Sequence, residues 1–186
     1  MSEIWFSSDL HHYHKNIQTF CADTRPKGTL DEMTDYIIEA HNSVVKKDDE
    51  FWHLGDFSFG TEQQTAEVLQ RMNGKLRFIR GNHDKVLDKS RLCQSYLTSY
   101  DEYKGIKIGD TKVYMFHYPI ESWNCKFRGS IHLHGHLHGD KHHECRTMRN
   151  RFDVGSDNRG DALMIPLNWD QVRERIKAQN ELIAVE

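Results

Sequence analysis

Short apolar runs alternate with longer amphipathic stretches along the first half of the chain. The runs at residues 4–6, 51–54 and 76–79 have the length of buried strands, and the stretches between them carry apolar residues at helical spacing. Because strands and helices alternate in this way, the pattern predicts an α/β arrangement.

Two capping boxes mark the expected starts of the helices between these strands. Thr29 is followed three residues later by Glu32, and Thr61 by Gln64, so each pair can satisfy backbone N–H groups at a helix N-terminus. The second helix is expected to stop at Asn73, because Asn followed by Gly is typical of a helix end.

The second half of the chain is less regular. Residues 84–111 form an irregular stretch in this interpretation, and strands are expected at 112–117, 131–134 and 151–155. Asn168 is expected to cap a final helix.

Polar residues follow each of the three strands predicted in the first half, at 9–11, 55–56 and 82–84. In an open α/β sheet, ligands bind beyond the carboxyl ends of the strands. These three segments are therefore expected to bring carboxylate, amide and imidazole groups to one edge of the sheet.

The composition fits one globular domain over residues 1–186, with 37% hydrophobic residues and no repeat, low-complexity tract or linker. No apolar run is long enough for a membrane span, and the N-terminus does not resemble a secretory signal. Four scattered cysteines suit free thiols, so a cytoplasmic location is expected. A net charge of −3 argues against strong binding to long duplex nucleic acid, and the oligomeric state stays open.

Histidine is over-represented, with 13 in the chain, and it is the commonest metal ligand in proteins. Asp9 and His11 are two residues apart, so at an extended strand end both side chains would point the same way and hold one metal. Asp56 is the expected bridging carboxylate, and Gly55 leaves room for close backbone approach. The predicted metal ligands are Asp9, His11, Asp56, Asn82, His117, His136 and His138.

This mixed nitrogen and oxygen set without cysteine predicts two divalent ions per chain, with Mn²⁺ expected and Fe, Zn²⁺ or Ni²⁺ as alternatives. Two such ions can activate a shared water for phosphoryl displacement. His83 could protonate the leaving alkoxide or contact the phosphate, and Asp84 could orient its ring. Arg80 or Arg128 could neutralise phosphate charge, so the expected substrate-binding residues are Asn82, His83 and Arg80.

The segments SDLH, LGDFSFG, RGNHD, FHYP and HGHLH, in this order, resemble the five metal motifs of the calcineurin-like metallophosphoesterases. The resemblance covers the whole chain and is nearest to a compact bacterial and phage branch of predicted phosphoesterases. It implies a four-layer α-β-β-α sandwich with a dinuclear metal site at the strand ends, and direct attack of metal-bound hydroxide on phosphorus.

The resemblance also implies a role for each motif residue. It makes His83 the catalytic histidine and Asp56 a ligand shared by both metals. The first metal would be held by Asp9, His11, Asp56 and His138, and the second by Asp56, Asn82, His117 and His136.

GDFSFG and GNHD differ from the motifs of the protein serine/threonine phosphatases in this superfamily and look more like the phosphodiesterase branches. We therefore expect a phosphodiesterase acting on cyclic or short nucleotides or on nucleic-acid ends. The alternatives are a phosphomonoesterase for phosphoproteins or small metabolites, and a metal-binding scaffold without activity.

Several polar residues outside the motifs have plainer interpretations. His41 and His53 are expected to be structural, and His132 and His134 to face a neighbouring strand or solvent. Tyr13, His14 and Asn16 follow the first motif and could reach substrate. A separate zinc site is the alternative to a solvated loop for His142, His143, Cys145 and Cys125.

Overall fold

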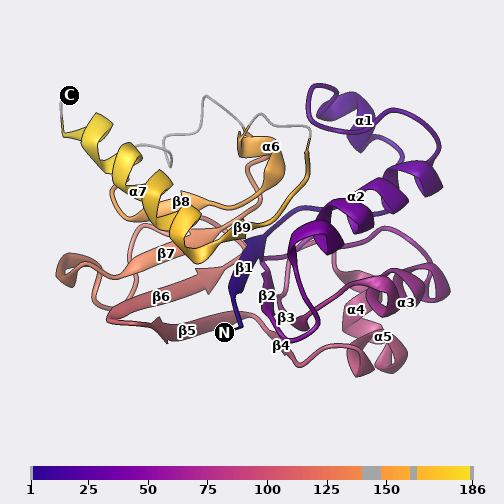
Figure 1. Cartoon of the computed structure of the whole chain (residues 1–186), viewed down its shortest axis with the longest axis horizontal. Coiled ribbons are helices and arrows are strands. Elements are labelled where there is room, and N and C mark those ends of the chain that lie inside the picture. Colours follow the sequence, from indigo (N-terminus) through magenta and orange to yellow (C-terminus); the bar gives the residue numbers. More distant parts are fainter. Residues whose placement is uncertain (1, 140–147, 160–162, 185–186) are drawn as a thin grey trace.

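The computed structural model describes residues 2–139, 148–159 and 163–184 (Figure 1). Its strands are β1 (Ile4–Ser7), β2 (Glu50–His53), β3 (Lys75–Ile79), β4 (Ser99–Asp101), β5 (Tyr103–Ile108), β6 (Thr111–Phe116), β7 (Ile131–His134), β8 (Arg151–Asp153) and β9 (Leu167–Asn168). Its α-helices are α1 (Ile17–Phe20), α2 (Leu30–Val44), α3 (Glu62–Arg71), α4 (Lys85–Lys89), α5 (Arg91–Ser95), α6 (Ser156–Arg159) and α7 (Trp169–Ile183), with one 3₁₀ turn, η1 (Lys126–Arg128).

Two sheets form the centre of the molecule. The first has the strand order β4-β3-β2-β1-β9, in which β1 to β4 run parallel and β9 pairs antiparallel with β1. The second has the order β5-β6-β7-β8, with β6, β7 and β8 parallel. The predicted α/β class is confirmed, and the architecture is two sheets flanked by helices.

Two apolar clusters hold these layers together, because successive side chains of a strand point to opposite faces. One face of the first sheet packs against α2 and α3 through Trp5, Phe51 and Phe78. The other face packs against the second sheet through Phe6, Trp52 and Ile79, and α7 adds Val172 and Ile176. Figure 1 shows α2 to α5 on one side of β1 to β4, with β5 to β8 on the other.

The helix starts follow the expected capping chemistry. Thr29 and Thr61 each accept a hydrogen bond from the backbone three residues on, and the reciprocal side-chain bond is present at both sites. Asn168 caps α7 in the same way, with Gln171 as its partner. Helix α3 ends at Arg71, two residues before the expected stop at Asn73.

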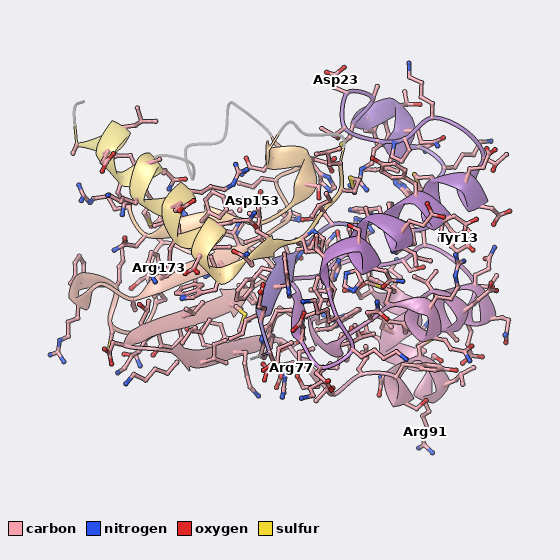
Figure 2. All side chains as sticks on the ribbon, in the orientation of Figure 1. Tyr13, Asp23, Arg77, Arg91, Asp153 and Arg173 are labelled. Carbon is pink, nitrogen blue, oxygen red and sulfur yellow. The ribbon has the colours of Figure 1, made fainter. Side chains whose placement is uncertain are left out.

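The irregular stretch expected at 84–111 is wrong, because it contains α4, α5, β4 and all of β5. These elements are short, and β5 alternates exposed and half-buried residues without a strongly apolar face. Helix α5 is largely open to solvent, and Arg91 points away from the molecule in Figure 2. The apolar periodicity of this segment is therefore too weak for its helices and strands to be recognised from the sequence.

None of the described helices is long and apolar enough to cross a membrane.

Candidate metal centre

The predicted ligands lie on loops that directly follow strands of both sheets. Asp9 follows β1, Asp56 follows β2, and Asn82 follows β3, while His117 follows β6 and His136 follows β7. Carboxyl ends of parallel strands meet at one edge of a sheet. The facing sheets therefore bring residues that lie more than 100 positions apart in the sequence into one site.

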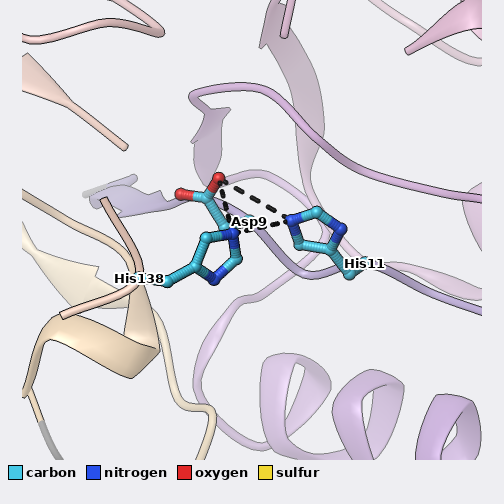
Figure 3. A group of neighbouring side chains, drawn as sticks. All are labelled: Asp9, His11 and His138. Carbon is cyan, nitrogen blue, oxygen red and sulfur yellow. Dashed lines mark hydrogen bonds and ion pairs between the residues drawn. The ribbon is translucent and has the colours of Figure 1, made fainter. Parts of the chain in front are cut away.

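The first cluster consists of Asp9, His11 and His138, whose ligand atoms all lie within 4.8 Å of one another. The Nε2 atoms of His11 and His138 are 3.0 Å apart, and Asp9 Oδ1 lies 3.9 and 3.8 Å from them (Figure 3). Asp9 Oδ1 is buried and has no hydrogen-bond partner among the described residues. Two imidazole nitrogens that converge on a buried carboxylate oxygen without a hydrogen-bond partner fit a bound cation.

The second cluster consists of Asp56, His117 and His136. His117 Nε2 lies 3.6 Å from Asp56 Oδ2 and 2.9 Å from the amide oxygen of Asn82. His117 Nδ1 contacts the carbonyl oxygen of Leu54 at 2.8 Å, so it carries the proton in the neutral ring. The lone pair of Nε2 is thereby aimed at the cluster, as a metal ligand requires.

Asp56 lies between the two clusters. Its Oδ2 atom is 3.6 Å from His117 Nε2 and 3.8 Å from His11 Nε2, and the carboxylate is 2% exposed. Burial alone would raise the pKa of Asp56, but the neighbouring His117 and the backbone N–H of His83 hold it below its usual range. The carboxylate therefore stays ionised, which suits a group shared by two cations.

The imidazoles respond to the same charges. Burial of His117 lowers its pKa, but the carboxylates of Asp56 and Asp9 outweigh this effect and raise the pKa to about 9. His11 is buried beside another imidazole, and its pKa falls to about 2. A negative environment that attracts protons to one ring also attracts cations, and the donor set fits divalent metals.

The backbone at these ligands differs from the extended conformation expected for Asp9 and His11. Both residues have positive φ angles, of 56° and 50°, and so do Asp56, His136 and His138. Tight left-handed turns, rather than strand alternation, aim the side chains at the centre. The histidines of the last motif also separate, because His138 joins the first cluster and His136 joins the second.

Two motif glycines allow the loops to approach each other. Gly55 has a φ of +98°, and a Cβ there would collide with the ring of His117. A Cβ on Gly135 would collide with the side chains of Ser8 and Asp9. The close approach of neighbouring groups to the backbone that was predicted at Gly55 is therefore present, and a side chain at Gly135 would likewise not fit.

His83 lies at the edge of the centre with its side chain 45% exposed. Its Nε2 atom is 4.0 Å from Asp56 Oδ2, and its backbone N–H donates to Asp56 Oδ1 at 2.8 Å. The ring packs on Phe59, with the ring centres 4.9 Å apart. An exposed imidazole beside the shared carboxylate is placed to contact a substrate.

Asp84 has different contacts from those the sequence suggested. Its carboxylate accepts backbone N–H bonds from Asp56, Phe57 and Gly81 at 2.7–3.0 Å, rather than orienting the ring of His83. Burial raises the pKa of Asp84 to about 6, although these N–H groups favour the anion. Asp84 thus ties the loop after β2 to the loop after β3.

The two arginines considered for phosphate binding are placed elsewhere. Arg80 makes a two-point ion pair with Asp88, at 2.7 and 2.8 Å, and lies 3.8 Å from Glu102. Its charge is therefore already neutralised by carboxylates. Arg128 lines a separate hollow beside Asp110 at the other end of the second sheet.

Sequence reasoning missed a buried network behind His138. His138 Nδ1 lies 2.7 Å from Asp157 Oδ2, and Arg25 donates to both oxygens of Asp157 at 3.1 and 2.6 Å. Arg25 also donates to the carbonyls of Leu10 and Asp9. Asp157 follows β8, just as the motif residues follow their strands. That position was the one feature of the sequence that could have indicated that Asp157 lies near the metal centre.

This network fixes the ring of His138. Burial lowers the pKa of His138, but the contacts with Asp157 and Cys21 and the charge of Asp9 together outweigh it and raise the pKa to about 10. The contact of Nδ1 with Asp157 leaves Nε2 as the ring nitrogen that faces the first cluster. A carboxylate behind a ligating histidine commonly sets its tautomer and orientation in this way.

The other histidines considered in the sequence are mostly structural. His41 is buried in α2, with Nε2 2.8 Å from the carbonyl of Asn73, and His53 is buried among aromatic rings. His132 and His134 are buried within the second sheet and contact backbone groups, not solvent. Of the residues considered for a separate zinc site, Cys125 is half-buried, and His142, His143 and Cys145 lie outside the described residues.

Comparisons with known proteins agree with this geometry. Residues 3–156 match the model of the calcineurin-like phosphoesterase superfamily domain. An uncharacterised protein of Methanocaldococcus jannaschii is 35% identical over 142 residues, which cover 75% of this chain and 72% of that protein. The Gene 66 protein of Mycobacterium phage D29 is 29% identical over 201 residues, covering 95% of this chain and 96% of the phage protein.

One solved structure supports the fold. A protein of unknown function from Aquifex aeolicus superposes with a TM-score of 0.74 at 22% sequence identity, covering 94% of this chain and 99% of that one. At this level of identity the similarity concerns the arrangement of the chain and not its chemistry.

Proposed function

Because this chain belongs to the calcineurin-like phosphoesterase superfamily, we propose that it hydrolyses phosphodiesters, with two divalent metal ions held at the edge of its two sheets. The observation that carries this proposal is the pair of ligand clusters on either side of Asp56. The proposed substrates are cyclic or short nucleotides or nucleic-acid ends. Residues 1–186 are proposed to act as one domain in the cytoplasm.

The contacts of each side chain support the proposed ligand sets. One ion would be held by Asp9, His11, His138 and Asp56, and the other by His117, His136, Asn82 and Asp56. Mn²⁺ is the proposed metal, because carboxylate and amide oxygens suit it and no thiolate is present, while the imidazoles make Fe, Zn²⁺ or Ni²⁺ the alternatives. Bound ions of this kind supply an activated water and offset the charge that develops on the phosphoryl oxygens.

The protein's own groups prepare the remaining steps. Leu54 and Asp157 contact Nδ1 of His117 and His138, which directs both Nε2 atoms inward, where a metal ion would take the place of a proton. The exposed ring of His83 would donate a proton to the leaving oxygen, within reach of a phosphoryl group beside Asp56. Asp84 would hold these loops in position through its hydrogen bonds to their backbone, and it would take no part in the proton transfer.

A diester is favoured over a monoester by the surroundings of the centre. The cavity next to the first cluster is walled by apolar side chains, which suits a second organic group on phosphorus. A monoesterase specific for phosphoproteins or sugar phosphates would gain from lysine or arginine side chains there, and among the described residues none lines this cavity beside its imidazoles.

The test is hydrolysis of bis(4-nitrophenyl) phosphate by chelator-treated protein, with Mn²⁺, Ni²⁺, Zn²⁺ or Mg²⁺ restored in turn. We expect turnover that depends on the metal and is strongest with Mn²⁺. Faster cleavage of 4-nitrophenyl phosphate than of the diester would replace the proposal with a monoesterase. Tight metal binding with no turnover of either compound would favour an inactive scaffold.

A further inference from the structure

A cavity of about 500 Å³ opens beside the first ligand cluster, on the side of α1. Its apolar wall is formed by Ile17 and Phe20 from α1, Phe59 from the loop after β2, and Leu137 between two predicted ligands. Imidazoles of the centre and its neighbourhood also line it, namely those of His11, His14, His83 and His138. The cavity therefore joins an apolar chamber to the proposed site of reaction.

Two phenylalanines give the chamber aromatic surfaces. The ring of Phe59 lies 5.3 Å from His11 in a stacked geometry and 4.1 Å from His14, yet the residue remains 39% exposed. Phe20 is 71% exposed although its neighbour Ile17 is buried. Isolated exposed aromatics are ordinary, but two that line one cavity beside a ligand cluster indicate a binding surface.

The lining chemistry points to a flat, uncharged group. Among the described residues that line the cavity, none is Lys, Arg, Asp or Glu. A second phosphate or a charged amino acid would find imidazoles but no lysine, arginine or carboxylate partner on these walls, whereas every nucleobase has a face that stacks on aromatic rings. The volume lies in the range of sites for small organic ligands and exceeds the needs of a phosphate alone.

We propose that this cavity binds the nucleobase of a nucleotide whose phosphate lies at the metal centre, with Phe20 and Phe59 as its stacking surfaces. The inference rests on the proposed function for the position of the phosphate. Phe20 is then a specificity-determining residue, because its contacts with the base would strengthen the binding of a nucleotide but not of a sugar phosphate.

The experiment compares the binding of AMP and ribose 5-phosphate to Mn²⁺-loaded protein by isothermal titration calorimetry. The two ligands share the phosphate and the sugar, so their difference in Kd reports the base. We expect AMP to bind more tightly by about 5- to 150-fold, the range of one base-stacking contact. Phe20→Ala should remove most of that difference while changing the Kd for ribose 5-phosphate by less than about twofold.

Two further variants keep this result interpretable. Phe20→Trp retains an aromatic face and should restore the preference for AMP. Phe127→Ala removes a phenylalanine that is 94% exposed on η1, away from the cavity, and should leave both ligands unaffected. Because Phe20 is itself largely exposed, its loss should not unfold the protein.

Equal binding of AMP and ribose 5-phosphate would overturn the inference, as would an equal loss of both in Phe20→Ala. Hexyl phosphate that binds like AMP and responds to Phe20→Ala in the same way would show an aliphatic site and also overturn it. A base preference that depends on Phe20, in a protein that cleaves no diester, would support the subsite while the proposed function fails. Cleavage of diesters without any base preference would leave the function standing and reject the subsite.

Discussion

Replacing the buried carboxylate of Asp157 with an amide tests the network behind His138. In the native protein this carboxylate accepts hydrogen bonds from Thr24, Arg25 and His138, and the side chains of Arg25 and Asp157 are 0% and 2% exposed. Asp157→Asn keeps the shape and one acceptor oxygen but removes the charge. The guanidinium of Arg25 is then buried opposite a neutral group.

The size of the effect follows from that burial. Removing one partner of a buried ion pair costs about 3–5 kcal/mol, because the remaining charge is left unpaired away from water. For a chain of this length, each kcal/mol corresponds to about 2–4 °C in Tm, so the metal-free variant should melt roughly 6–20 °C lower. The ring of His138 also loses its orienting acceptor, and affinity for the first metal should fall by about 10- to 100-fold.

The assay is thermal unfolding of the metal-free protein followed by circular dichroism, together with a Mn²⁺ titration by calorimetry. The control is Asp35→Asn, since Asp35 pairs with Arg71 at 2.7 Å while the two side chains are 51% and 39% exposed. That surface pair should be worth less than about 1 kcal/mol. Equal Tm values for the two variants, or unchanged Mn²⁺ affinity in Asp157→Asn, would refute the reasoning.

Three further predictions concern the centre and the core. Asp56→Asn should abolish diesterase activity and lower the bound metal, measured by atomic emission, because the group between His11 and His117 loses its charge; full activity would contradict a shared ligand. His83→Ala should retain both metals yet slow turnover by about 10²–10⁴-fold, since its backbone bond to Asp56 survives; a normal rate would remove this ring from the mechanism. Burial lowers the pKa of His132 to about 4, so as the pH falls the unfolded chain binds a proton at this residue before the folded chain does. The free energy of unfolding should therefore fall by about 1.4 kcal/mol per pH unit between about pH 6.5 and 4. Urea unfolding at several pH values in this range should show that the free energy of unfolding of His132→Gln falls less steeply with decreasing pH. An identical pH dependence in the two proteins would exclude this histidine as a source of acid sensitivity.

Local signals in the sequence predicted much of the fold. The capping boxes at Thr29 and Thr61 and the apolar strands depend on neighbours within a few residues, so they can be recognised without tertiary information. The convergence of the polar residues at the ends of β1, β2 and β3 was also predictable, because parallel strands present their carboxyl ends at one edge of the sheet.

Long-range contacts were not predictable in this way. Arg25 and Asp157 lie 132 positions apart, and neither belongs to a periodic pattern that would reveal the pairing. The motif resemblance assigned His136 and His138 to different metals, but their spacing alone did not, because the separation depends on left-handed backbone at both residues. Strand β5 was missed because its half-buried face carries only Ile106 and Ile108 beside Lys104, which is a weaker apolar pattern than in the buried strands.

The left-handed turns explain why two buried residues outside the ligand set matter. A non-glycine residue in this conformation costs about 1–2 kcal/mol, and five predicted ligands adopt it. Such strain persists only where the surrounding contacts determine the backbone. Asp84 provides them by accepting three backbone N–H groups around Asp56, and Arg25 provides them by donating to the carbonyls of Asp9 and Leu10. These two side chains therefore hold the ligand loops in place before any ion binds, which reduces the reorganisation that binding requires.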